Sequence, residues 1–193
     1  MEARITPAAQ FSTISILRLA LLSSIVIAAP LLTSATDPAT GHTHGAPAPA
    51  QLVQMVRLAT FQYIDVNRAI AAGYGPFLGC VSGPDHGAMG THYINLSFYG
   101  DGEIDVWHPE ALMYEGSQGA LHLVGAEFIV DAQTWLANHD NTPPVLDGQT
   151  FQLVNSPNRY NLPAFFELHV WAWRNNPNGA FVDWNNLVTC EGQ

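Results

Sequence analysis

Acidic and imidazole side chains interrupt segments of this chain that are otherwise apolar. Residues 120–130 (ALHLVGAEFIV) contain Glu127, and residues 165–173 (FFELHVWAW) contain His169. A third apolar segment follows a glycine-rich stretch and carries His92. A buried carboxylate without a partner is very costly, so each such acid must be neutralised, paired or bound to a metal. The chemistry on offer is therefore a buried polar network or cation binding.

Cationic partners for these acids are scarce. The chain has six arginines, no lysine and sixteen acidic residues, which give a formal net charge of -10. Two imidazoles and one carboxylate suit zinc, copper, iron or nickel. We therefore expect His92, Glu127 and His169 to ligate a transition-metal ion, although they lie far apart and no short motif such as HExxH links them. An open coordination position would permit chemistry, but the sequence does not decide whether the protein is an enzyme.

Further polar residues are expected to orient the ligands. They are Glu167, His122, Tyr93 and Glu115. The alternative is a metal-free core in which Glu127 and His169 hydrogen-bond each other or buried backbone. On that interpretation the chain is a non-metal module for a small polar ligand, or a structural envelope protein.

The elements that must position these residues follow from periodicity and turn composition. Residues 51–72 have apolar side chains at helical spacing, and Gly73 is suited to end that helix. Residues 73–90 are rich in glycine and proline and predict a long ordered loop. Strands are expected at 91–99, 103–107, 111–115, 120–130, near 151–154 and at 165–173. The expected fold class is α+β, an N-terminal helix packed on a mainly antiparallel β-sheet or a small open barrel.

The N-terminal residues predict export. The apolar run 19–32 is too short to span a bilayer comfortably and is followed by small residues, which predicts a signal peptide over 1–35. An uncleaved membrane anchor is the alternative. Residues 36–50 are rich in alanine, proline and threonine and predict a disordered linker, which leaves 51–193 as a single domain. The expected localisation is secreted or periplasmic.

Two cysteines fit this compartment. Cys80 and Cys190 form an even pair, which favours a disulfide in an oxidising environment. Such a bridge would stabilise the fold by about 4–5 kcal/mol through loop closure. A cysteine ligand or catalytic thiol is the alternative, but neither residue lies in a CxxC pair.

Charge and motifs exclude several partners. An acidic chain does not displace counterions from phosphates, so nucleic acid is excluded, and anionic membranes are disfavoured after signal cleavage. The sequence has no GxSxG, P-loop or GxGxxG pattern. A metal ion or a small ligand is therefore the expected partner.

Several blocks of the chain resemble an uncharacterised family of secreted bacterial proteins. The blocks are MGTHYIN (89–95), PEALMYEG (109–116), LVGAEFIV (123–130) and ELHVWAWRNNPNGAFVDWNN (167–186), with Cys190 after the last. The resemblance covers roughly residues 85–190 and implies a shared fold. It transfers no catalytic residue, although the three expected ligands fall inside the blocks.

Overall fold

A computed structural model describes residues 50–83, 86–117 and 119–192. All of these residues belong to one compact unit, Thr43–Gln193. The signal peptide expected over 1–35 and nearly all of the expected linker lie outside the described residues. Within the part of the chain that is described, no helix is both long and apolar enough to cross a membrane.

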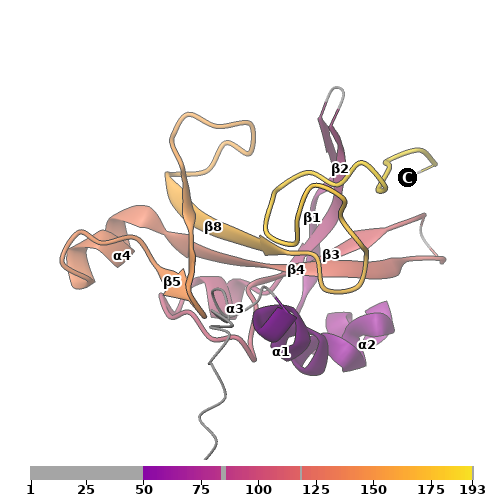
Figure 1. Ribbon diagram of the computed structural model, residues 1–193, viewed down its shortest axis with the longest axis horizontal. Coiled ribbons are helices and arrows are strands. Elements are labelled where there is room, and N and C mark those ends of the chain that lie inside the picture. The colour runs from indigo at the N-terminus through magenta and orange to yellow at the C-terminus, as the bar shows by residue number, and fades with distance from the viewer. Residues whose placement is uncertain (1–49, 84–85, 118, 193) are drawn as a thin grey trace, which may run out of the picture. The chain divides into compact units, whose positions relative to one another are not determined.

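The centre of the fold is a curled antiparallel sheet of six strands in the order β1-β2-β3-β4-β8-β7 (Figure 1). Its strands are β1 (Gly75–Gly83), β2 (Gly87–Ile94), β3 (Ala111–Glu115), β4 (His122–Asp131), β7 (Gln152–Val154) and β8 (Phe165–Val170). Strands β5 (Val145–Leu146) and β6 (Gln149–Thr150) form a separate small hairpin. The helical elements are α1 (Ala50–Thr60), η1 (Phe61–Ile64), α2 (Val66–Ala71), α3 (Leu96–Tyr99) and α4 (Ala132–Asn138). The expected α+β class is confirmed.

Helix α1 packs on one face of the sheet. Its residues Leu52 and Val56 are fully buried in the main apolar core, together with side chains of β3, β4 and β8. Trp173, just after β8, donates from Nε1 to the Thr60 hydroxyl at the end of α1 over 2.9 Å. In Figure 1, α1 and α2 lie on the lower side of the sheet and the yellow C-terminal segment on the upper side.

The predicted helix over 51–72 is interrupted. The side chain of Asp65 accepts a hydrogen bond from the backbone N–H of Asn67, so it caps a new helix and separates α2 from η1. The predicted end at Gly73 is confirmed: its φ is 97°, and Tyr74 N–H donates to the carbonyl of Ala69. This is the Schellman arrangement that favours glycine.

The prediction of a loop over 73–90 is wrong. Residues of β1 and β2 pair along the hairpin, and two register shifts, one after Phe77 in β1 and one at Met89 in β2, accommodate the glycine-rich sequence. The strand expected at 91–99 ends at Ile94, because the side chain of Asn95 accepts from Ser97 N–H and begins α3. Residues 103–107 do not form the expected strand either. There the carboxylates of Asp101 and Asp105 accept backbone N–H groups two residues ahead and fix turns instead.

The other expected strands are confirmed. Strands β3 and β4 match the segments expected at 111–115 and 120–130 and pair as a hairpin, and β7 and β8 match the segments expected near 151–154 and at 165–173. Helix α4 was not expected, because Val130 and Asp131 look like the end of an apolar strand. The carboxylate of Asp131 accepts from Thr134 N–H and caps the helix at that point.

The second face of the sheet carries two small apolar clusters. Met113 and Trp171 belong to one of them, and Ile129 and Phe165 to the other. The C-terminal segment crosses this face, since Trp171 donates from Nε1 to the carbonyl of Val182. The expected disulfide between Cys80 and Cys190 is present, with a sequence separation of 110, and it fastens this segment to β1.

Candidate metal centre

Three strands of the second face bring the expected ligands together. His92 lies on β2, Glu127 on β4 and His169 on β8. Glu127 and His169 are directly paired across β4 and β8. His92 must reach Glu127 across β3, where Ala111 pairs with Glu127 and the Met113 side chain packs over Gly125, a residue without a side chain. The small side chains on this path leave room for the imidazole and the carboxylate to meet.

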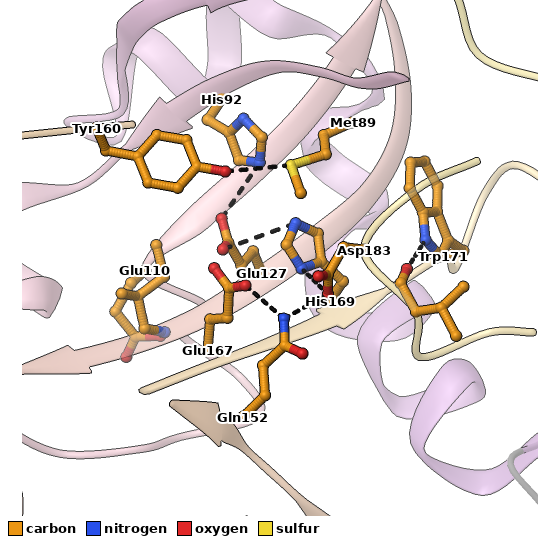
Figure 2. A network of polar contacts seen from close by, with 12 residues as sticks. Met89, His92, Glu110, Glu127, Gln152, Tyr160, Glu167, His169, Trp171 and Asp183 are labelled. Atoms are coloured by element: carbon orange, nitrogen blue, oxygen red, sulfur yellow. Dashed lines mark hydrogen bonds and ion pairs between the residues drawn. The ribbon is translucent and has the colours of Figure 1, made fainter. Parts of the chain in front are cut away.

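The three side chains converge on a common point (Figure 2). His92 Nε2 lies 3.2 Å from one carboxylate oxygen of Glu127, and His169 Nε2 lies 3.7 Å from the other. One donor atom from each residue lies within 4.8 Å of the other two. All three residues are buried. This buried His/Glu/His group can hold a metal ion.

In this group, the ring nitrogens of His169 are the buried polar atoms that lack hydrogen-bond partners among the described residues. The His169 side chain is 1% exposed, and neither ring nitrogen has a hydrogen-bond partner among the described residues. A neutral imidazole has one N–H donor and one lone pair, and leaving such groups unpaired in the interior is unfavourable. A bound cation on one nitrogen would remove that penalty.

Burial keeps both histidines neutral. It lowers the pKa of His169 to about 3, and burial together with the nearby His169 lowers the pKa of His92 to about 3. Neutral imidazoles retain the lone pair that a metal ion needs.

Burial favours the neutral form of the acids as well, and for a carboxyl group this means a raised pKa. It raises the pKa of Glu127 well above its usual range, and the neighbouring Glu167 carboxyl raises it further. Burial also raises the pKa of Glu167. A bound cation would oppose both shifts, because it stabilises the charged form of a carboxylate.

Two residues that the sequence did not indicate join the cluster. Asp183 Oδ1 lies 3.5 Å from His169 Nδ1, and Gln152 Nε2 donates to both Asp183 Oδ1 and Glu167 Oε1 over 2.6 Å each. Glu167, His169 and Asp183 form a second group with donor atoms within 4.8 Å of one another. Asp183 could have been found because the expected disulfide returns its segment to the sheet, whereas nothing in the sequence marks Gln152.

Of the four residues expected to orient the ligands, only Glu167 lies at the cluster. Tyr93 follows His92 directly and therefore points to the opposite face, where its ring packs against Tyr114 with centroids 5.0 Å apart. His122 is exposed at the start of β4 and pairs there with Glu115. Glu115 contacts Arg174, with 3.6 Å between its Oε1 and the arginine Nε. These three expectations are wrong because strand alternation and strand length carry the side chains away.

A pocket of about 80 Å³ opens next to the cluster. His92, Glu127 and Glu167 are its polar lining residues, and hydrocarbon side chains dominate the rest of its wall. Above this polar end, the Tyr160 hydroxyl lies 3.5 Å from the sulfur of Met89 (Figure 2). The arrangement can bind a cation with two nitrogens and a carboxylate and leave one side of it accessible.

The chain was compared with protein-family models, with curated proteins and with solved structures. None of the three comparisons gives a match. The function proposed for this site is therefore inferred only from the residues that form it.

Proposed function

We propose that this protein is exported and binds one transition-metal ion, zinc, copper, iron or nickel, through His92, Glu127 and His169. The observation that carries the proposal is the convergence of three buried donor groups around His169, whose two nitrogens lack hydrogen-bond partners among the described residues. Two imidazoles with one carboxylate are a common ligand set for these ions.

The surroundings of the His169 ring support metal binding through Nε2. Nε2 faces Glu127 and Nδ1 faces Asp183. If Nε2 binds the ion, Nδ1 carries the proton and points it at the Asp183 carboxylate. A carboxylate that accepts the second N–H of a ligating histidine fixes the ring and makes it a better ligand.

The disulfide supports the exported location. Disulfides persist in oxidising compartments and are rare in the cytosol. Cys80 and Cys190 are paired, and no free cysteine remains among the described residues.

Three protein ligands leave one position open on a tetrahedral ion. That position can hold a water molecule, which the ion would activate, or an external donor atom. We favour binding without turnover, because Glu167 and Asp183, the other acids of the cluster among the described residues, both accept hydrogen bonds from Gln152.

A second candidate is a metal-free polar network that lines a pocket for a small ligand. The raised pKa values of Glu127 and Glu167 favour it, because protonated carboxyls need no cation. The metal site predicts that one added ion binds per protein chain, whereas the metal-free network predicts that none binds.

Metal titration tests the proposal. Protein folded with its disulfide intact is stripped with a chelator and titrated with Zn²⁺, Ni²⁺ or Cu²⁺ by calorimetry. We expect one equivalent to bind. At a hundredfold excess over Kd it should stabilise the fold by about 2.7 kcal/mol, on the order of 10 °C in Tm.

Variants locate the site. Glu127→Gln keeps the shape but removes the charge, and His169→Ala removes a ligand, so both should lose stoichiometric binding. His122→Ala is the control, because His122 is an exposed histidine on the same strand as Glu127. Binding that persists in both site variants, or no binding to the unmodified protein, would favour the metal-free network.

A further inference from the structure

We infer that the apolar pocket beside the cluster binds a small uncharged molecule with a short hydrocarbon body, whose single donor atom completes the coordination of the metal ion. The inference rests on the proposed metal site and names the kind of ligand that the site takes.

The pocket lies on one side of the expected ligands. Its lining includes His92 and Glu127 but, of the described residues, not His169. An ion held by all three therefore has His169 on its inner side and the pocket on its accessible side. An external ligand reaches the open coordination position through this pocket.

The wall of the pocket selects for hydrocarbon. Its buried part is formed by Val81, Ile129 and Phe165, and its half-buried part includes Phe77, Tyr160 and Leu162. The volume of about 80 Å³ is smaller than the roughly 150 Å³ of an apolar cavity that takes up benzene. The enclosed part therefore accommodates a compact group of a few carbon atoms.

The mouth of the pocket is built by a β-bulge. Phe77 pairs with His92 and Cys80 pairs with Thr91, so Leu78 and Gly79 bulge out of β1. Leu78 has a φ of 57°, a left-handed conformation that is unfavourable for leucine. Bulges near binding sites re-aim side chains, and this one puts a 58% exposed leucine at the mouth.

A second exposed leucine completes this rim. Leu96 also lines the pocket and is 73% exposed. Contiguous exposed hydrocarbon next to a polar cluster is typical of ligand sites.

The charges around the cluster exclude ionic ligands. The carboxylates of Glu127, Glu167 and Asp183 offset the positive charge of a bound divalent ion, so an anion gains little attraction there, and the apolar wall makes desolvation of any ion costly. A neutral molecule avoids this desolvation cost. Its donor atom is a nitrogen, oxygen or sulfur with a free lone pair.

Cobalt-loaded protein provides the test. The full chain with its disulfide is loaded with Co²⁺, whose visible absorption changes when a new ligand coordinates. Imidazole, 4-methylimidazole and 4-ethylimidazole are titrated at pH 8, with acetate as the anionic comparison. Burial of each added carbon should tighten binding about four-fold, and acetate should bind more weakly than any of the imidazoles.

Two matched variants assign the effect to the pocket. Leu78→Asn replaces the hydrocarbon with a residue that tolerates the left-handed conformation, and it should reduce the preference for 4-ethylimidazole over imidazole at least two-fold. Leu187→Asn is the control, because Leu187 is 48% exposed and lies outside the described lining. It should leave the preference unchanged.

The outcomes separate the two proposals. Cobalt binding without tightening along the imidazole series, or equal behaviour of Leu78→Asn and Leu187→Asn, overturns the pocket inference and leaves the metal site standing. Failure of Co²⁺ and of the other ions to bind overturns the metal site, and the inference with it.

Discussion

His169 contacts a carboxylate on each side of its ring, and the two contacts have different roles in the proposed site. Glu127 lies on the Nε2 side as a ligand, and Asp183 lies on the Nδ1 side as a residue that positions the ring. Gln152 holds Asp183 in place through a 2.6 Å hydrogen bond. The affinity of the site for the metal ion should therefore depend on Asp183, a residue that does not touch the ion.

Asp183→Asn tests this positioning role. The amide keeps the size of the side chain but weakens the acceptor for the Nδ1 proton, so metal affinity should fall about 10–100-fold without loss of the one-to-one stoichiometry. Calorimetric titration measures the change. Asp147→Asn is the control, because Asp147 lies in the turn between β5 and β6 with a φ of 47° that asparagine adopts readily. Equal affinity in both variants would contradict the assignment.

A buried acid outside the cluster makes stability depend on pH. Glu110 is 1% exposed, its carboxyl accepts the backbone N–H of Ile129 over 3.0 Å, and burial raises its pKa to about 8. The unfolded chain releases this proton near pH 4.5, whereas the folded chain keeps it until about pH 8. Between these values the unfolded state binds fewer protons, so stability falls as pH rises, with a limiting slope of about 1.4 kcal/mol per pH unit.

Glu110→Gln should remove this contribution. The amide oxygen still accepts from Ile129, and the side chain no longer ionises. The metal-free variant and the metal-free unmodified protein should have similar Tm values at pH 4.5, and the variant should be the more stable of the two at pH 8. Thermal denaturation across this range measures the difference. Parallel Tm curves would show that Glu110 does not keep its proton in the folded state.

At the scale of elements, the hairpin of β1 and β2 holds the C-terminal segment against the sheet. Ala88 forms an isolated β-bridge with Asn185, two residues beyond Asp183. Gly87 has a φ of 79°, and a Cβ atom there would collide with the backbone carbonyl of Asn185. The close approach of the segment that carries Asp183 therefore depends on a glycine at this position.

Gly87→Ala should displace that segment. Gly148→Ala is a matched control, because Gly148 has a φ of 80° but no described atom within 4 Å of the added Cβ. Both variants lose stability from backbone strain, on the order of 1 kcal/mol. Only Gly87→Ala should lose more than this and also bind metal as weakly as Asp183→Asn. Urea denaturation and calorimetry measure the two effects, and identical losses in the two glycine variants would contradict this account.

The elements also show where sequence patterns are informative. The hairpin of β3 and β4 and the strand β8 were predictable, because their apolar runs are bounded by turn residues. The hairpin of β1 and β2 was not, because glycine and proline lower the local preference for a strand. The β1–β2 hairpin depends on β3 instead, where Tyr114 and Met113 pair with Thr91 and His92 of β2. These partners come from another part of the chain.

At the scale of the whole molecule, the disulfide closes the domain. Cys80 lies on the edge strand β1 next to the bulge, and Cys190 ends the segment that covers the second face. The bridge therefore restrains both the pocket mouth and the C-terminal segment that carries Asp183.

Replacing both cysteines, Cys80→Ala with Cys190→Ala, should destabilise the metal-free fold by about 4–5 kcal/mol from loop entropy. Urea denaturation measures this loss. The control is the unmodified protein before and after reduction, which should differ by a similar amount. A change of less than about 1 kcal/mol would mean that the packing of Val188 and Trp171 alone retains the segment.

The sequence alone determined the features that depend on neighbouring residues. Gly73 ends a helix, apolar runs bounded by turn residues predict β3 and β4, and a lysine-free chain with acids in apolar strands predicts that those acids need partners. An even cysteine pair predicted the bridge. These features follow from local conformational preference and from composition, which require no knowledge of distant contacts.

Only the tertiary structure decided that the three expected ligands meet and which further residues join them. The meeting of His92 with Glu127 across β3 depends on sheet curl and on small residues along that path, and the arrival of Asp183 depends on a tail fastened by the disulfide. Tyr93 was excluded by one residue of strand register. Register and curl are set by pairings between segments far apart in the chain, and no local pattern encodes them.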